Sequence, residues 1–83
     1  MKLPRDVSGQ DLARLLSRLK YEVTRQTGSH LRLTREGEVP HHITIPRHES
    51  LKVETLSGIL KEVAEHLQIS KDELMTTLWG GED

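Results

Sequence analysis

The sequence predicts a small two-layer α+β domain in which helices cover one face of a three-stranded antiparallel sheet. Leucines recur at helical spacing over residues 8–20, and three short alternating segments follow between residues 21 and 45. A longer run with a broad apolar face begins near residue 53. The predicted order is therefore α-β-β-β-α, with an extra short helix at the C-terminal end.

The first helix is expected to begin after Ser8, because a serine side chain can cap the first backbone amides of a helix. Asp11 follows three residues later, in a position like that of a capping box. The apolar stripe of this helix consists of Leu12, Leu15, Leu16 and Leu19. The helix is expected to end near Lys20.

Three strands are predicted over residues 21–27, 30–35 and 42–45, joined by turns at Gly28-Ser29 and Glu36-Gly37-Glu38. Pro46 is expected to end the third strand, because proline cannot donate to the ladder. In the first strand, alternation assigns Tyr21 and Val23 to one face and Glu22, Thr24 and Gln26 to the other.

Alternation also predicts a polar outer face on the sheet, away from the helices. Its side chains are His30, Arg32, Thr34, His42 and Thr44. Arginine offers a forked donor for phosphate, and threonine hydroxyls can contact ribose or backbone oxygens. Every two-layer domain needs a polar outer face, so on this pattern alone a plain solvated surface is the simpler interpretation.

The C-terminal part is predicted to form two helices. Residues 53–67 carry the broad apolar face, and Gly58 inside this helix is expected to allow close approach of a neighbour. Ser70 and Glu73 form a capping box that opens the last short helix. Residues 1–83 are expected to form a single domain with an ordered core of about residues 7–79, and residues 80–83 are expected to fray.

Composition excludes several kinds of chemistry. The chain of 83 residues has no cysteine, which removes disulfides, thiolate zinc sites and a thiol nucleophile and fits a reducing cytoplasm. The start of the chain does not resemble a signal peptide, and no apolar run is long enough to span a membrane. The net charge is −1, but basic residues dominate from Arg5 to Lys52 and acidic residues follow. The net charge argues against a generic polyanion binder but not against a local basic face, and the uneven charge fits either such a face or plain solvated charge.

Gly28-Ser29-His30 is the most informative short motif, because it places an imidazole in a tight turn beside a glycine and a hydroxyl. Histidine can both take and give a proton near physiological pH. The adjacent His41 and His42 should point to opposite faces of a strand and so cannot easily chelate one ion. No metal site and no cofactor are therefore expected.

Four short motifs follow one another along the chain: Leu12-Ala13-Arg14-Leu15-Leu16, Gly28-Ser29-His30, Ile45-Pro46-Arg47-His48 and Thr55-Leu56-Ser57-Gly58-Ile59-Leu60. In this order they resemble the motifs of the HicA toxins of bacterial and archaeal toxin–antitoxin pairs. The resemblance covers about residues 7–78. It implies a fold like that of a double-stranded-RNA-binding domain, which agrees with the predicted element order. The family usually has glycine where this chain has Glu54.

The resemblance also implies a ribonuclease that cleaves messenger RNA and is silenced by a HicB-type antitoxin. The catalytic histidine of that family corresponds to His30. RNA cleavage needs no metal, because the ribose 2′-hydroxyl can attack its own phosphate. The reaction needs a base, an acid and cationic donors for the charged intermediate.

For this reaction we expect His30 to act as base, or as acid when protonated. The Ser29 hydroxyl and the backbone amides from Gly28 to His30 are expected to hold phosphate oxygens. Arg32 is the nearest cation on the same face, and Arg25 and Lys52 are weaker candidates for holding the RNA strand.

The second proton-transfer group is His42 or His48; the sequence does not decide between them. Two other functions also fit the same fold. One is a non-catalytic RNA-binding module, and the other is a protein–protein adaptor whose polar face binds a partner. An antitoxin is expected to cover the face that carries His30, or alternatively to bind the acidic C-terminal helices.

Overall fold

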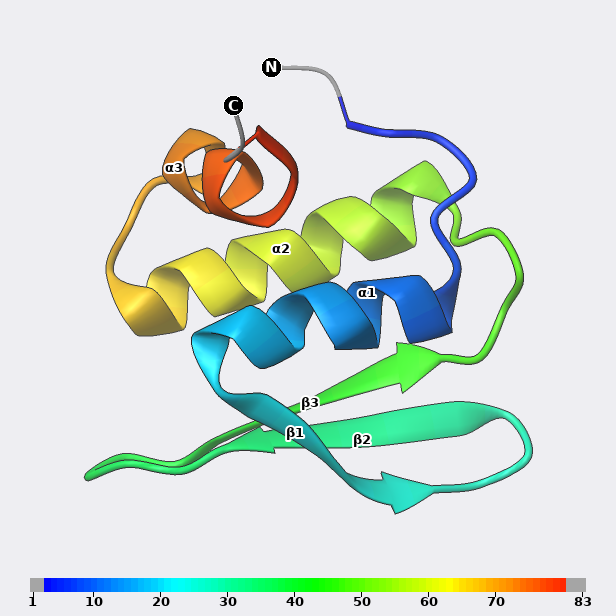
Figure 1. The fold of residues 1–83 in the computed structure, drawn as a ribbon, viewed down its shortest axis with the longest axis horizontal. Coiled ribbons are helices and arrows are strands. Elements are labelled where there is room, and N and C mark those ends of the chain that lie inside the picture. Colours follow the sequence, from blue (N-terminus) through cyan, green and yellow to red (C-terminus); the bar gives the residue numbers. More distant parts are fainter. Residues whose placement is uncertain (1–2, 81–83) are drawn as a thin grey trace. The chain divides into compact units, whose positions relative to one another are not determined.

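The computed structural model describes residues 3–80, and these fold in the predicted order of one helix, three strands and then helices (Figure 1). The predicted α+β class, with the α-β-β-β-α order of a double-stranded-RNA-binding-domain-like fold, is therefore confirmed. The chain forms two compact units. One is residues 4–51, and the other contains Leu3 and the described residues from Lys52 onward.

Helix α1 spans Gly9–Leu16 and continues as a 3-10 turn over Ser17–Leu19. It begins where predicted, because the Ser8 side chain accepts a hydrogen bond of 2.9 Å from the backbone amide of Asp11. Lys20 ends it in the left-handed region, with a φ of 71°. Its buried face consists of Gly9, Leu12, Ala13 and Leu16.

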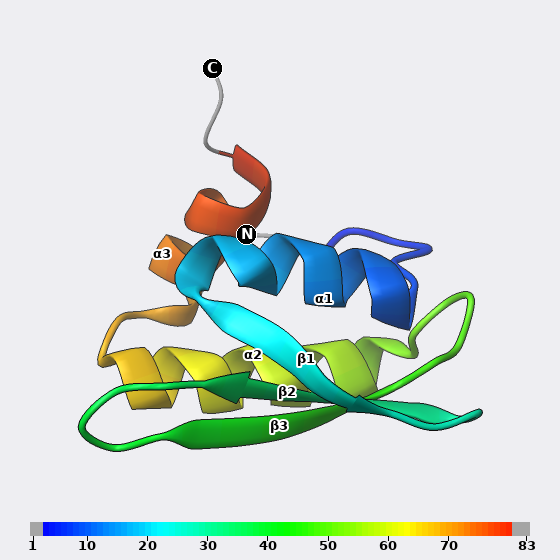
Figure 2. The same cartoon turned by 60° about the horizontal axis from the view of Figure 1, so that its bottom comes forward.

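The sheet consists of β1 (Tyr21–Gln26), β2 (His30–Arg35) and β3 (His41–Pro46), all antiparallel, with β2 in the centre (Figure 2). On its inner face Leu31 pairs with Ile45 and Leu33 with Ile43, and all four are buried. Helix α1 lies along this inner face, so the first unit has two layers.

A bulge in β1 overturns part of the predicted alternation. Val23 pairs with Leu33, but the next pair is Arg25 with Arg32, so Thr24 is an extra residue in β1. Beyond the bulge every side chain changes face, and Gln26, expected on the face opposite Val23, pairs with Leu31 on the same inner face as Val23. Val23 lies on the same face as Tyr21, as predicted, but is 45% exposed, because β1 is an edge strand.

The packing of α1 against the end of β3 leaves no room for a side chain at Gly9. A Cβ atom at this position would lie 2.0 Å from the carbonyl oxygen of Pro46, at the end of β3. The Gly9 amide also donates to the carbonyl of His48 at 2.9 Å. At Gly58, by contrast, an added Cβ would meet no neighbouring segment within 4 Å among residues 3–80, so the expected close approach there is wrong.

The second unit contains α2 (Val53–Leu67), α3 (Lys71–Met75) and a π-type turn over Thr76–Gly80. The capping box of Ser70 and Glu73 is present as predicted, and the Lys71 ammonium donates to the Ser57 hydroxyl of α2. Glu54 lies in the first turn of α2, where its negative charge interacts favourably with the positive end of the helix dipole and stabilises the helix. The buried side chains are Leu56, Ile59, Leu60, Val63, Ala64, Leu74, Met75 and Leu78.

Gly80 closes the π-type turn, and residues 81–83 of the expected frayed tail lie outside the described residues. Within residues 3–80, none of the helices has the length and apolar character needed to cross a membrane.

Candidate functional site

The turn between β1 and β2 carries His30 and is organised by the Thr27 side chain. The Thr27 amide donates to the His30 carbonyl at 2.9 Å, which closes the hairpin. The Thr27 hydroxyl oxygen accepts from the amides of His30 and Ser29, at 3.0 and 3.3 Å. Two of the three amides expected to hold phosphate are therefore already engaged within the turn.

The hydroxyl of Ser29 contacts the imidazole of His30 directly. Its oxygen lies 2.8 Å from Nδ1, and both side chains are exposed. A hydrogen bond at one ring nitrogen sets the tautomer and the orientation of the ring. No group among residues 3–80 bonds Nε2, so this nitrogen is the one available to a substrate.

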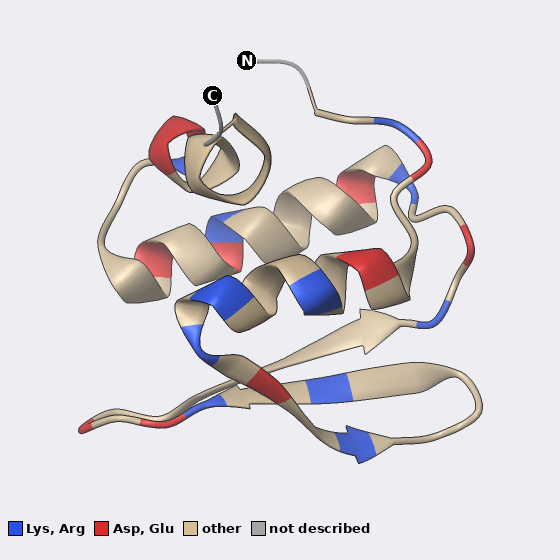
Figure 3. Ribbon diagram, viewed as in Figure 1, with Lys and Arg blue, Asp and Glu red and all other residues tan. Residues whose placement is uncertain are grey.

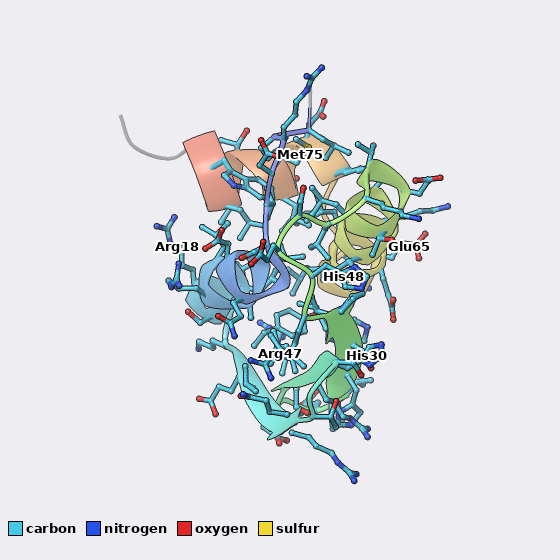
Figure 4. All side chains as sticks on the ribbon, turned by 90° about the vertical axis from the view of Figure 1, so that its right-hand side faces the viewer. Arg18, His30, Arg47, His48, Glu65 and Met75 are labelled. Atoms are coloured by element: carbon cyan, nitrogen blue, oxygen red, sulfur yellow. The ribbon has the colours of Figure 1, made fainter. Side chains whose placement is uncertain are left out.

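Arg47 holds the turn from the end of β3. Its backbone amide donates to the Ser29 carbonyl at 2.8 Å, and its Nη1 donates to the Thr27 carbonyl at 2.9 Å. Figure 4 labels Arg47 and His30 at the same level of the sheet. Sequence reasoning missed this residue, although it lies inside the Ile-Pro-Arg-His motif.

The predicted outer face has the expected composition. Thr34 pairs with His42, Arg32 pairs with Thr44, and His30 pairs with Pro46, so the even-numbered side chains of β2 and β3 share this face. Arg32, His42 and Thr44 are exposed. Arg25 lies beyond the bulge and pairs with Arg32, so its side chain belongs to the same outer face. Figure 3 shows the basic positions of β1 and β2 on neighbouring parts of the two strands.

His42 and His30 lie at opposite ends of this face. The pairs that contain them are four residues apart, which corresponds to about 13 Å along the strands. The His42 Nδ1 is 2.9 Å from the Thr34 hydroxyl, which is also 2.9 Å from the Thr24 hydroxyl. Thr34 is only 5% exposed, so it is not available to a ligand as the sequence suggested.

His48 is nearer to the turn along the chain, two residues beyond the Pro46 that pairs with His30. It is exposed and lines a depression of about 320 Å3 together with Gly28 and Arg47; the other lining residues are Ser8, Gln10 and Glu49. Figure 4 shows His48 and His30 toward the same side of the first unit. His48 and Gly28 of the turn therefore line the same depression.

Two other expectations concern His41 and Lys52. The His41 Nδ1 lies 2.6 Å from the hydroxyl of the buried Tyr21, whereas His42 belongs to the outer face, so the two histidines do diverge. Within the part of the chain that the structure describes, no three His, Asp or Glu side chains gather to hold a metal ion.

Lys52 is exposed at the N-cap of α2 and begins the second unit, whereas the turn belongs to the first.

Comparison with known families identifies the class of protein. The model of the family described as "HicA toxin of bacterial toxin-antitoxin" matches residues 9–64, more than half of the chain. The matched region includes the whole sheet, the Gly-Ser-His turn and most of α2. The chain therefore belongs to the HicA toxin family, as the motifs predicted. It is the toxin of a toxin–antitoxin system, and its partner is an antitoxin.

No curated protein and no solved structure matches the chain.

Proposed function

We propose that this toxin is a metal-independent endoribonuclease that cleaves messenger RNA, with His30 as its general acid and base. The observation that carries the proposal is the exposed imidazole of His30, which is oriented by the Ser29 hydroxyl at 2.8 Å on a turn that Arg47 holds. An oriented imidazole with one open nitrogen meets the geometric requirement for proton transfer to or from a bound substrate.

The chemistry uses the RNA's own nucleophile. The 2′-oxygen bonds to the adjacent phosphorus while His30 Nε2 accepts the 2′-hydroxyl proton. The bond from phosphorus to the 5′-oxygen then breaks, and that oxygen receives a proton. The products are a 2′,3′-cyclic phosphate and a free 5′-hydroxyl. Negative charge builds up on the phosphate oxygens, and Arg32 is the nearest outer-face cation to His30 along β2.

For the second proton we favour His48 over His42. His48 shares the depression with Gly28, whereas His42 lies about 13 Å along the strands from His30 and is bonded to Thr34. Lys52 stays a candidate for holding the RNA strand, because it is exposed.

We further propose that the antitoxin is HicB-like and inhibits by covering the outer face of the sheet. Covering His30 is the simplest way to exclude RNA. This face is polar and exposed over His30, Arg32 and Thr44, which suits a partner that binds reversibly. We place the pair in the cytoplasm, where messenger RNA is present and a chain without cysteine loses nothing to reduction.

The decisive experiment compares purified wild-type toxin with His30→Ala on a single-stranded RNA substrate. Loss of one acid–base group typically lowers the rate by about 10²–10⁴-fold, so cleavage should fall by at least a hundredfold. RNA binding and the circular dichroism spectrum should be retained. His66→Ala on α2 is the matched control, because it removes a histidine outside the turn.

Three outcomes would contradict the proposal. Wild-type rates in His30→Ala would refute the catalytic assignment. A wild-type protein that binds RNA without cleaving it would be the RNA-binding module. A protein that binds an antitoxin but no RNA at low salt would be the adaptor.

A further inference from the structure

We propose that Arg25 and Arg32 together bind a single phosphate of the RNA backbone, adjacent to the phosphate at which His30 acts. This inference rests on the RNA substrate proposed above. It adds a second phosphate site that the bulge in β1 assembles.

The bulge determines which face receives Arg25. Before it, Tyr21 pairs with Arg35 and Val23 pairs with Leu33, so uninterrupted pairing would place Arg25 opposite Leu31. Leu31 lies on the inner face, so Arg25 would then face away from Arg32. The extra residue Thr24 moves Arg25 instead to a position directly opposite Arg32 on the outer face.

The resulting pair brings two guanidinium groups within reach of one anion. Directly opposed residues of antiparallel strands have Cβ atoms about 5 Å apart, so both side chains can converge on one phosphate. Arginine suits this role, because its forked donors match the oxygens of a phosphate. Both side chains are exposed, so a strand lying on the sheet has access to them.

Among the described residues, nothing neutralises the charges of the pair. Like charges directly opposite each other on a sheet destabilise it. Neither guanidinium has a hydrogen-bond or ion-pair partner among residues 3–80, and Glu22, on the same face, pairs with Thr34 rather than with either arginine. A bound phosphate would supply the missing negative charge. The arrangement is therefore better explained by a ligand than by folding.

The position of the pair identifies the phosphate. Arg32 and His30 are two residues apart on the same face of β2, which corresponds to about 7 Å. A phosphate held between the arginines is therefore not the one at His30 Nε2 but a neighbour along the strand. Binding it would orient the RNA across the turn.

The test measures affinity for a single-stranded RNA oligonucleotide in the His30→Ala background, where no cleavage interferes. The variants are Arg25→Gln, Arg32→Gln and the double variant, each titrated at several salt concentrations. Arg14→Gln is the matched control, because Arg14 is an exposed arginine of the same unit that pairs with Asp11 on α1.

Each single variant should weaken binding at least fivefold, and the double variant should reduce the slope of log affinity against log salt by about 0.7 in total, the value for one phosphate of a single strand. Because the phosphate is shared, the double variant should lose less affinity than the product of the two single effects. Thermal unfolding should not move to lower temperature, since the substitutions relieve repulsion. Arg14→Gln should change neither affinity nor slope.

Two results would overturn the inference. Unchanged affinity in both single variants would mean that the arginines do not contact RNA. Multiplicative losses, with twice the reduction in slope, would mean that each arginine binds its own phosphate. These binding measurements are independent of the cleavage assay on wild-type protein. Absence of cleavage would refute the ribonuclease proposal without affecting the arginine site, and unchanged binding would refute the arginine site without affecting the ribonuclease proposal.

Discussion

The hydrogen bonds from Arg47 make a quantitative prediction about the turn that carries His30. We consider Arg47→Met, which keeps the length of the side chain and removes its donors. The substitution deletes the hydrogen bond from Nη1 to the Thr27 carbonyl, while the backbone bond from residue 47 to Ser29 stays.

The expected loss of stability is modest. A hydrogen bond with a charged partner contributes about 1.5–3 kcal/mol, and we take the lower end because Arg47 is only half-buried. The expected loss of activity is larger, because a displacement of about 1 Å at a catalytic group can cost about 10²-fold in rate. We therefore expect the single-turnover cleavage rate to fall by about 10–100-fold, with a decrease of about 1.5 kcal/mol in the free energy of unfolding.

Arg47→Lys separates positioning from charge. Lysine keeps the positive charge but lacks the planar fork, so a positioning role predicts that Arg47→Lys stays impaired in the rate constant with little change in KM. Single-turnover cleavage at saturating and subsaturating RNA measures the two separately. A wild-type rate constant in Arg47→Met, or a defect confined to KM and restored by lysine, would refute the positioning argument.

Three further predictions concern the same unit. Gly9→Ala should lower the free energy of unfolding by about 1–3 kcal/mol, since its Cβ would lie 2.0 Å from the Pro46 carbonyl oxygen; a urea midpoint equal to that of wild type would contradict this. Thr27→Val should reduce cleavage about tenfold, because the amides of Ser29 and His30 lose their acceptor; unchanged cleavage at unchanged stability would contradict it. Hydrogen bonds with the Ser8 side chain and backbone, then with Arg14, lower the pKa of Asp11. Its stabilising effect is therefore present above the ordinary carboxyl pKa and lost as pH falls through the lowered one. The stability difference between wild type and Asp11→Ala, from urea unfolding at several pH values, should shrink below about pH 4, and a difference that grows there would contradict the assignment.

Much of the fold follows from local sequence. The cap at Ser8, the capping box of Ser70 and Glu73, and the spacing of the leucines act within one or two helical turns, so they can be read without knowing the tertiary structure. The outer-face assignments in β2 and β3 were also correct, because those strands pair without interruption and alternation then holds along their whole length.

The bulge at Thr24 was not predictable in this way. It depends on how β1 matches β2, and it reverses the face of Arg25 and Gln26 relative to simple alternation. No residue in the first strand marks it, since Thr24 is an ordinary strand residue. Our preference for His48 over His42 likewise rests on the register of β2 against β3 and on the depression that His48 lines with Gly28.

The sequence by itself determined the element order, the polar outer face and the turn with His30, because helical spacing, alternation and turn residues act over a few positions. Only the tertiary structure decided that Arg47 holds this turn, that Gly9 must lack a side chain, and that Arg25 faces Arg32. The contacts of Arg47 and Gly9 join residues about twenty or more positions apart, and the partner of Arg25 depends on the register of two strands. Chain topology and strand register create these relationships, and no local pattern encodes either.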